Sequence, residues 1–341
     1  MELYLRRENM SSFWKGKKVL VTGAEGFIGS NLTEELARQG AEVRAFIFYN
    51  SFGTWGWFDK TEAELLKHID IFPGDIRDPH RVAEAVNEQE VILHLASLIG
   101  IPYSYHAPDS YVDTNVKGTL NVVNACRSAG VERVIYTSTS EAYGTALYVP
   151  IDEKHPLQPQ SPYSASKIAA ENIALSFYYS FKLPVTVLRP FNTFGPRQSA
   201  RAIIPTVISQ IYAGKRTIEL GNLTPTRDFN YVKDTVNAFM KLAESSDVDG
   251  EVFNAGSGRE ISMKDLVELI IKITGRNVKV VKKQERLRPE KSEVERLVCD
   301  NTKIKQRCGW KPTVTLEQGL ELTCKWIKDN LDTCKPSVYN V

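Results

Sequence analysis

A glycine-spaced turn between a strand and a helix constrains this fold more than any other feature of the sequence. The apolar run KKVLVTG at residues 17–23 predicts a buried strand, and residues 31–39 predict a helix. Between them stand Gly23, Gly26 and Gly29. Glycines in such a turn let the backbone approach a pyrophosphate, which then sits on the amide-rich helix N-terminus. The pattern therefore predicts a dinucleotide-binding turn.

Apolar runs and amphipathic stretches keep alternating as far as Pro190. The further predicted strands are residues 41–49, 70–75, 91–96, 131–140 and 183–191. The helical patterns between them are residues 79–88, 110–129 and 163–181. Strand–helix alternation of this kind makes a parallel sheet that is covered on both faces. The predicted fold class is α/β, a Rossmann-type doubly wound parallel sheet with a smaller α/β substrate-binding lobe.

The rhythm breaks after Pro190, where amphipathic helices at residues 261–275 and 314–330 are separated by charged loops. We expect three parts: a cofactor-binding domain of residues 17–190 and 229–257, a substrate-binding domain of residues 191–228 and 258–335, and a loose N-terminal arm of residues 1–16.

Composition excludes several classes of protein. The net charge of +2 lacks the basic excess of a nucleic-acid binder. No apolar stretch approaches the length of a membrane span, and the first residues do not resemble a secretion signal. The 5 cysteines are odd in number and form no Cys-x-x-Cys pair, so we expect neither a disulfide framework nor a metal site. These features predict a cytoplasmic protein without nucleic-acid or membrane partners.

The cofactor site is expected at the turn and at the ends of the next strands. The usual acid for the ribose of NAD is absent from residues 43–52, where Asn50 or Ser51 could bond the ribose instead. Arg44 would suit NADP but lies inside a strand, so the pattern favours NAD and leaves NADP open. The candidate cofactor-binding residues are Gly23, Gly26, Phe27, Ile28, Gly29, Asn50, Ser51, Asp75, Ile76, Leu95, Ala96, Tyr163 and Lys167.

Tyr163 and Lys167 form the clearest catalytic pair. Their spacing of four places both on one face of a predicted helix. An ammonium beside a phenol would lower the pKa of Tyr163 and make it a usable base. The run Thr139-Ser140-Glu141 follows a predicted strand, at the edge where parallel sheets bind ligands. We expect a hydroxyl, a carboxylate and the Tyr-Lys pair to converge there.

These motifs, in this order, resemble those of the extended short-chain dehydrogenase/reductases that act on nucleotide sugars. The resemblance covers about residues 17–330, with TGAEGFIG, HLA, NVKGT, TSTSEAYG, YSASK, RPFNTFGPR, TRDFNYVKD and LRPE. Within this family the sequence most resembles the NAD-dependent N-acetylglucosamine 4,6-dehydratases of the legionaminic and pseudaminic acid pathways. The segments that carry this resemblance are IPYSYHAPDSYVDTNVKGT, PFNTFGPRQSARAIIPT and LRPEKSEVERL. The resemblance implies a Rossmann lobe, a small substrate lobe and a homodimer.

The resemblance also assigns catalytic roles. Tyr163 would take the proton of the sugar 4-hydroxyl, Thr139 would hydrogen-bond that oxygen, and Lys167 would hold the cofactor ribose and tune Tyr163. Glu141 would remove the C5 proton, a residue that simple 4-epimerases lack. Ser140 stands where the dTDP-glucose dehydratases carry an aspartate, so the proton donor to the leaving hydroxyl is not assigned.

Substrate contacts follow from the same resemblance. Asn192, Arg227 and Arg288 match residues that meet the diphosphate, and guanidinium groups suit phosphate oxygens. Glu290 or Glu293 could accept a hydrogen bond from the nucleotide ribose. The further candidates are Ser104 and Pro205. The base, uridine or guanosine, stays open.

Three other functions stay open on sequence alone. The same residues could serve a C5 epimerase, or an enzyme acting on a 5,6-unsaturated UDP-sugar of the same pathway. A UDP-glucuronate decarboxylase shares the Thr-Ser-Glu run. A non-catalytic nucleotide sensor is disfavoured by the intact Thr139, Tyr163 and Lys167.

Overall fold

A seven-stranded sheet forms the centre of the molecule in the computed structural model, which describes residues 13–336. Every neighbouring pair of strands is parallel, and the order is β10-β6-β5-β4-β1-β2-β3. The strands are β1 (Lys18–Thr22), β2 (Glu42–Phe48), β3 (Ile69–Gly74), β4 (Val91–His94), β5 (Arg133–Thr137), β6 (Val185–Pro190) and β10 (Val252–Ala255). The predicted Rossmann-type α/β fold is confirmed, and β10, from the late segment 229–257, adds a strand to this sheet.

The strand order reverses between β1 and β4, which lie side by side. At such a switch point the loops leave the sheet in opposite directions and open a crevice beyond the carboxyl ends of the strands. The glycine-spaced turn follows β1, and the Thr139-Ser140-Glu141 run follows β5, two strands away. The topology therefore brings both sequence motifs to the same edge of the sheet.

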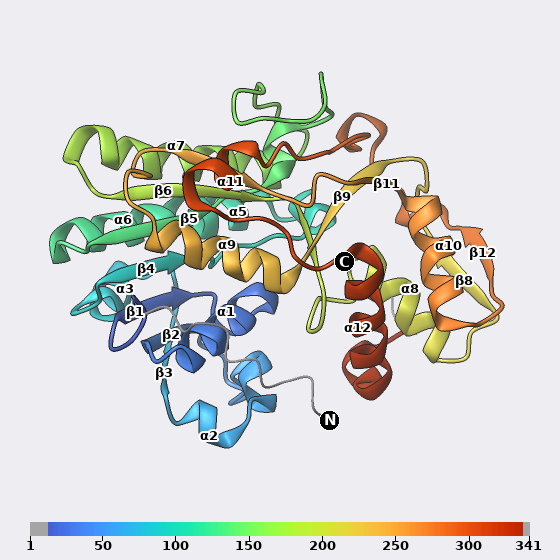
Figure 1. The fold of residues 1–341 in the computed structure, drawn as a ribbon, viewed down its shortest axis with the longest axis horizontal. Coiled ribbons are helices and arrows are strands. Elements are labelled where there is room, and N and C mark those ends of the chain that lie inside the picture. Colours follow the sequence, from blue (N-terminus) through green and yellow to red (C-terminus); the bar gives the residue numbers. More distant parts are fainter. Residues whose placement is uncertain (1–12, 337–341) are drawn as a thin grey trace.

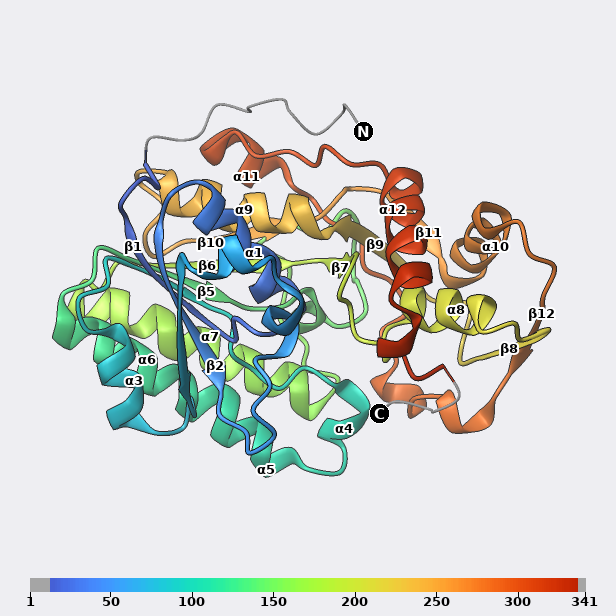
Figure 2. The same ribbon diagram turned by 90° about the horizontal axis from the view of Figure 1, so that it is seen from below.

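Helices cover both faces of this sheet, as Figures 1 and 2 show from two directions. One face carries α1 (Phe27–Arg38) and α9 (Val232–Glu244), which pack together. The other carries α3 (Pro79–Val86), α6 (Gly118–Ala129) and α7 (Pro162–Phe181), side by side. Because the sheet is buried on both faces, its strands read as continuous apolar runs in the sequence.

The start of α7 is fixed by its own sequence. The Ser161 hydroxyl accepts the backbone N–H of Ser164, the Ser164 hydroxyl bonds back to the Ser161 N–H, and Pro162 occupies the first turn. Such a capping box satisfies N–H groups that a helix otherwise leaves unpaired. The cap defines where α7 begins and thereby sets the positions of Tyr163 and Lys167.

A second group of elements gathers at one end of the molecule, on the right in Figures 1 and 2. It contains two small sheets, in the orders β11-β9-β7 and β12-β8. The elements are β7 (Asn192–Phe194), α8 (Ile203–Tyr212), β8 (Thr217–Leu220), β9 (Thr226–Tyr231), β11 (Glu260–Ser262), α10 (Met263–Thr274), β12 (Lys279–Lys282) and α12 (Leu316–Asp329). The predicted division of the chain into two domains stays a prediction.

Shorter elements complete the described chain. They are α2 (Ala63–Leu66), α4 (Ile101–Ser104), α5 (Pro108–Tyr111), α11 (Thr302–Cys308), a π-helical segment at Val112–Lys117, and 3-10 turns at Gly56–Lys60, Ser140–Tyr143, Gln284–Arg286, Glu290–Ser292 and Leu331–Thr333. Helix α11 lies in the range expected for the substrate lobe, but it contacts β10 of the main sheet, where Lys303 Nζ donates to the Val252 carbonyl at 2.7 Å.

The structure corrects three sequence expectations. The first helix starts at Phe27, directly after the glycine turn, rather than at Asn31. The single helix expected over residues 110–129 is interrupted by the π-helical segment. Residues 1–12 of the predicted loose arm lie outside the described residues, but Trp14 is fully buried and donates to Glu244 Oε1 at 2.6 Å. The end of that arm is thus packed against α9.

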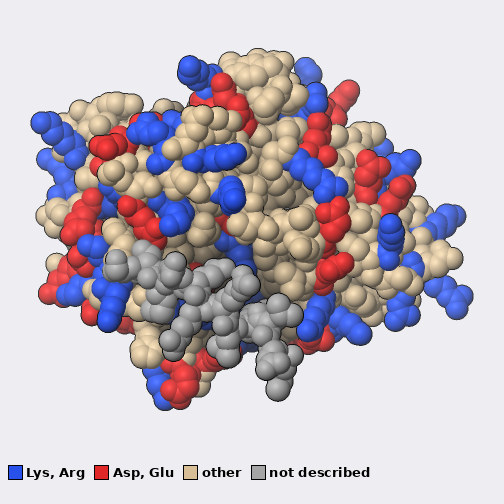
Figure 3. Space-filling model, in the orientation of Figure 1, with Lys and Arg blue, Asp and Glu red and all other residues tan. Residues whose placement is uncertain are grey.

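The surface carries mixed charge. On the face drawn in Figure 3, basic and acidic side chains are interspersed. Within residues 13–336 no helix is long and apolar enough to cross a bilayer. The same part of the chain holds no group of three or more His, Cys, Asp or Glu side chains placed to bind a metal ion.

Candidate active site

The glycine turn leaves no room for side chains where a phosphate would approach. Gly23 has φ +66°, and a Cβ there would lie 2.9 Å from the Ala96 Cα. A Cβ on Gly29 would lie 2.2 Å from the Gly23 carbonyl oxygen. Gly26 caps α1 without any side-chain hydrogen bond, so the first amides of the helix, at Phe27 and Ile28, are not covered by a cap. A bare helix N-terminus behind a close-packed glycine turn fits the pyrophosphate of a dinucleotide.

The ends of β1 and β4 are tied together by a polar network that the sequence did not reveal. Thr22 Oγ1 accepts the N–H groups of Leu95 and Ala96, each at 3.1 Å, and bonds His94 Nδ1 at 2.7 Å. His94 Nε2 bonds Thr119 Oγ1 at 3.1 Å. Burial lowers the pKa of His94 to about 3, so this ring is neutral. The network fixes the relative position of the ends of β1 and β4 beside the glycine turn.

The residues beyond β2 and β3 use their polar groups locally. The Asn50 amide donates to the Thr54 carbonyl at 2.9 Å and accepts from the Phe52 N–H, so it stabilises its own loop, while Ser51 is exposed. Asp75 pairs with Arg77, whose hydrogen bonds lower the pKa of that carboxyl. The side chain of Ile76, next to it, is buried.

Arg44 points away from a cofactor role. Its Nε donates to Asp70 Oδ2 at 2.8 Å, and its Nη1 donates to the Ala85 carbonyl at 3.1 Å. The first contact links β2 to β3, and the second holds the end of α3 against the sheet. Arg44 is therefore committed elsewhere and is not available to bind the 2′-phosphate of NADP.

Tyr163 and Lys167 lie buried at the start of α7. Lys167 Nζ donates to the Thr137 carbonyl at 2.5 Å and lies 4.7 Å from the centre of the Tyr136 ring. Burial lowers the pKa of Lys167 to about 7. The ammonium therefore interacts with the end of β5.

The expectation that Lys167 lowers the pKa of Tyr163 is wrong for this structure. Burial raises the pKa of Tyr163, and a hydrogen bond with Thr139 only partly offsets that effect. The cause is the dry environment, which disfavours the phenolate.

Glu141 reaches the same place through Thr139. The Thr139 hydroxyl accepts the Glu141 backbone N–H at 3.2 Å and bonds Tyr163, so one hydroxyl contacts both the backbone of the predicted C5 base and the side chain of the predicted base for C4 oxidation. The side chain of Glu141 is 13% exposed, and Ser140 beside it is buried. The convergence expected at the end of β5 is present in the structure, although the roles of these residues stay predictions.

A group of charges from the smaller sheets faces Glu141. Arg227 lies on β9 with its Nε 3.9 Å from Glu141 Oε1, and its Nη1 donates to the Thr226 carbonyl at 2.9 Å. Glu293 Oε1 lies 3.7 Å from Arg227 Nη2 and 3.5 Å from Arg288 Nη1. We call Arg227, Arg288 and Glu293 the arginine cluster. Arg227 thus lies next to Glu141, the predicted C5 base, and Glu293 connects Arg227 to Arg288.

Asn192 belongs to the same surface. It pairs in register with Phe229, two residues beyond Arg227, so Asn192 and Arg227 project from the same face of their sheet. The Oδ1 atom of Asn192 is buried and lacks a hydrogen-bond partner within the described residues. An unpaired amide oxygen on the same sheet face as Arg227 fits a ligand-binding position.

Two predicted substrate residues, Ser104 and Pro205, do not face an open site in this structure. Ser104 is fully buried and donates to the Ile101 carbonyl within its own helix at 2.7 Å. Pro205 is buried within α8. Glu290 is exposed, whereas Glu293 is the carboxylate that meets the arginines. The sequence could not separate these two acids because they share one short turn.

A buried ion pair behind the catalytic run was missed altogether. Glu171 accepts from Arg189 Nε at 3.0 Å and from the Ser138 hydroxyl at 2.5 Å. Arg189 Nη1 donates to the Tyr143 hydroxyl at 2.7 Å. The Thr139-Ser140-Glu141 run lies between Ser138 and Tyr143, so one ion pair fixes both of its ends. A signal was present, since Glu171 stands four residues after Lys167 on α7.

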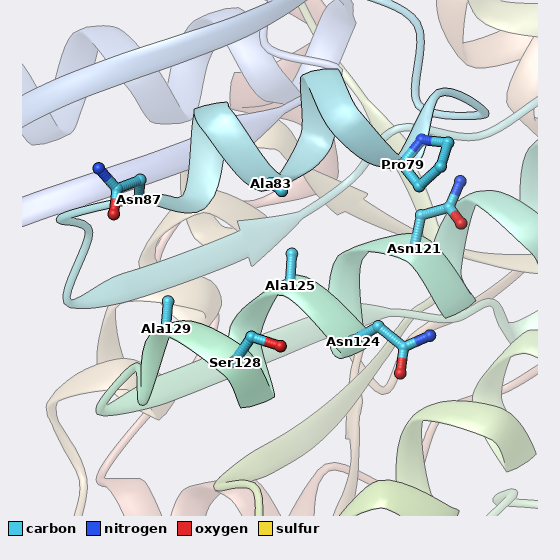
Figure 4. Close-up of a pocket in the computed structure, with 8 residues that line it drawn as sticks. All are labelled: Pro79, Ala83, Asn87, Asn121, Asn124, Ala125, Ser128 and Ala129. Carbon is cyan, nitrogen blue, oxygen red and sulfur yellow. The ribbon is translucent and has the colours of Figure 1, made fainter.

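One further hollow has a different chemical character. A cavity of about 360 Å³ lies between α3 and α6 on the covered face of the sheet (Figure 4). It is lined by Pro79, Ala83, Asn87, Asn121, Asn124, Ala125, Ser128 and Ala129. Because none of these side chains is ionisable, the cavity offers no acid or base for catalysis.

With this geometry described, comparison with known proteins identifies the family. The family model described as GDP-mannose 4,6 dehydratase matches residues 20–323. The chain belongs to the extended short-chain dehydrogenase/reductases that act on nucleotide sugars. Members of this family are NAD-dependent dehydratases, epimerases and decarboxylases, so the chain is an enzyme and the predicted NAD-dependent family is confirmed.

Individual members of the family differ in reaction. The dTDP-D-glucose 4,6-dehydratase of Mus musculus is 31% identical, over 94% of this chain and 91% of its own length. The UDP-N-acetyl-alpha-D-glucosaminuronate decarboxylase of Bacillus cytotoxicus is 32% identical, over 92% and 98%. The crystal structure of DesIV, a dTDP-glucose 4,6-dehydratase from Streptomyces venezuelae with NAD bound, has a TM-score of 0.84 at 26% identity, covering 93% of this chain and 99% of that one. The family therefore fixes the cofactor chemistry but not the product.

Proposed function

We propose that this enzyme is a 4,6-dehydratase of a UDP- or GDP-linked N-acetylhexosamine, in the biosynthesis of sialic-acid-like sugars such as legionaminic or pseudaminic acid. The observation that carries the proposal is the position of Glu141: its backbone N–H donates to the Thr139 hydroxyl, which bonds Tyr163, and its carboxylate lies close enough to Tyr163 to raise the pKa of that phenol. Dehydration needs a second base, besides the one that serves C4 oxidation, to remove the C5 proton. The carboxylate of Glu141 is the group that would serve as this base.

The residues act in sequence in this proposal. Tyr163 accepts the proton of the sugar 4-hydroxyl while Thr139 hydrogen-bonds that oxygen, and the C4–H bond breaks to leave a ketone. The glycine turn would hold NAD, which would supply the acceptor for the C4 hydride and the donor of hydride to C6. Lys167 binds the cofactor ribose, and its ammonium adds positive charge to a site that otherwise disfavours the phenolate.

Glu141 then removes the C5 proton. The new ketone at C4 makes that proton far more acidic, so a carboxylate is an adequate base. The C5–H electrons form a C5–C6 double bond as the C6 hydroxyl leaves with a proton as water. Hydride addition at C6 and a proton at C5 complete a 4-keto-6-deoxy sugar, and the net change is the loss of one water.

The arginine cluster and Asn192 anchor the nucleotide in this proposal. Arg227 and Arg288 would bind the diphosphate. Because Arg227 also lies next to Glu141, a diphosphate bound there would bring the sugar close to Glu141. The predicted homodimer and cytoplasmic location stay predictions, and sedimentation of the purified enzyme would test the dimer.

The product mass tests the reaction directly. Purified enzyme is incubated with UDP-N-acetylglucosamine, and the product is analysed by mass spectrometry. The proposal expects the loss of one water. An unchanged mass with an inverted or exchanged C5 would indicate an epimerase. Turnover only of a UDP-uronate, with release of carbon dioxide, would instead indicate a decarboxylase like the Bacillus cytotoxicus relative.

A further inference from the structure

Glu293 occupies the space between two cations that come from different segments. It follows the 3-10 turn Glu290–Ser292, while Arg227 lies on β9 and Arg288 precedes the turn. A single oxygen, Glu293 Oε1, lies 3.7 Å from Arg227 Nη2 and 3.5 Å from Arg288 Nη1. One carboxylate therefore serves both guanidinium groups that the proposed function gives to the diphosphate.

These contacts are loose. Both distances exceed the usual 2.7–3.2 Å of an N–H···O hydrogen bond, so the two pairs are held by charge alone. The Nη1 atom of Arg288 is buried and has no hydrogen-bond partner among the described residues. Burial raises the pKa of Glu293, while Arg288 and Arg227 lower it. The carboxylate is thus partly desolvated without good hydrogen bonds in return.

The loop allows Glu293 to leave. Its backbone is tied to its own turn, with the Glu293 N–H bonded to the Pro289 carbonyl, and to Gln160, which donates to the Glu293 carbonyl at 3.3 Å. The neighbouring Glu290 is exposed. Rotation of the Glu293 side chain therefore requires no movement of a helix or a strand.

A diphosphate satisfies the same two arginines better. It carries several anionic oxygens, and planar guanidinium groups bind such oxygens in pairs of hydrogen bonds. Arg227 is already oriented, because its Nη1 donates to the Thr226 carbonyl and its Nη2 faces Glu293.

We propose that Glu293 is an internal competitor of the substrate, a carboxylate that holds Arg227 and Arg288 until a nucleoside diphosphate displaces it. This rests on the proposed function only in taking the ligand to be a nucleotide sugar. The two possible roles of Glu293 have opposite effects on nucleotide affinity. A competitor weakens nucleotide binding, whereas a carboxylate that accepts a hydrogen bond from the ribose strengthens it.

The test is the affinity of Glu293→Gln for nucleotides. The holoenzyme is titrated calorimetrically with UDP, GDP and dTDP, and the nucleotide that binds the wild type is compared with its parent nucleoside. Two loosely held charge pairs correspond to about 3- to 10-fold in affinity, so Kd for the nucleoside diphosphate should fall by that factor. Kd for the nucleoside should not change, because it lacks phosphate.

Glu285→Gln is the matched control. Glu285 is exposed in the preceding turn Gln284–Arg286, and its removal changes the net charge by the same amount. We expect no change in Kd. An equal gain in Glu285→Gln would attribute the effect to overall charge and overturn the proposal, as would an unchanged Kd in Glu293→Gln.

If Glu293→Gln instead raises Kd for the nucleoside diphosphate, and this rise disappears with a 2′,3′-dideoxy nucleotide, Glu293 binds the ribose. Because the readout is binding, the result is independent of whether product masses identify a dehydratase, an epimerase or a decarboxylase. Failure of the proposed function and failure of this inference are therefore separate outcomes.

Discussion

The two charged groups on either side of Glu141 are held in different ways. Behind it, Glu171 and Arg189 are buried, hydrogen-bonded to each other and to the residues that flank the catalytic run. In front of it, the arginine cluster is held by pairs 3.5–3.9 Å long. The first group is complete without a ligand, whereas the second lacks hydrogen bonds that a diphosphate would supply. The enzyme thus has a rigid catalytic side and a nucleotide side that its ligand completes.

The largest effect is expected on the rigid side, at Tyr163. Tyr163→Phe removes only the group that accepts the 4-hydroxyl proton, so turnover should fall by roughly 10²–10⁴-fold while NAD binding is retained. Turnover and NAD affinity are measured on the same preparation. Cofactor reduction by substrate at a near wild-type rate in this variant would remove Tyr163 from the mechanism.

Breaking the buried ion pair should cost more stability than breaking the loose one. Arg189→Leu leaves Glu171 buried without its partner and should lower the free energy of unfolding by about 3–5 kcal/mol. Arg288→Leu, in the partly exposed arginine cluster, should lower it by less than about 1 kcal/mol. Urea unfolding of both variants gives the comparison, and equal losses would contradict the distinction between the two sides.

The rigid side should also show its buried charge in the pH dependence of stability. The pKa of Lys167 is about 7 in the folded chain against an ordinary 10.5. Between these values the unfolded chain holds a proton that the folded chain has released, so Lys167 makes stability rise with pH, by up to about 5 kcal/mol. Below pH 7 both states hold the proton, and its contribution no longer changes.

The control for that effect is Lys167→Met, measured by urea unfolding without added cofactor. The charged and polar groups that interact with Lys167 are His94, Tyr136, Glu171 and the Thr137 carbonyl, and the variant keeps all of them. The free energy of unfolding of the wild type minus that of the variant should increase from pH 7 to about pH 10. A constant difference would mean that the lysine keeps an ordinary pKa.

On the nucleotide side the effect should appear in binding. Arg227→Ala removes a charge-assisted contact worth about 1.5–3 kcal/mol, so KM should rise far more than stability falls. Initial rates and thermal unfolding are compared with those of the wild type. An unchanged KM would remove Arg227 from the substrate site and weaken the contrast between the two sides.

The motifs that sequence could find lie next to the elements that position them. The glycine turn follows β1 directly, Tyr163 and Lys167 share one helix, and Glu141 follows β5, so local spacing and parallel topology bring them together. The pairing of Glu171 with Arg189 depends on the packing of α7 against β6, which no local pattern encodes. The same limit explains Ser104, whose hydroxyl is used by its own helix.

The sequence also does not show in which direction a side chain points. Arg44 could have faced either side of its strand, and only the packing of α3 shows that it binds Asp70 and a helix end. The pKa of Tyr163 depends on burial, which the helical spacing of Tyr163 and Lys167 cannot report.

The most direct measurement is Glu141→Gln with substrate in heavy water. The amide keeps the shape of the side chain but cannot accept the C5 proton, whereas C4 oxidation by Tyr163 does not need it. The account predicts that reduced-nicotinamide absorbance rises on adding substrate and persists, with a 4-keto sugar bound and C5 deuterium exchange abolished or strongly slowed. Wild-type exchange in Glu141→Gln would show that another group is the C5 base and would contradict the central role of Glu141.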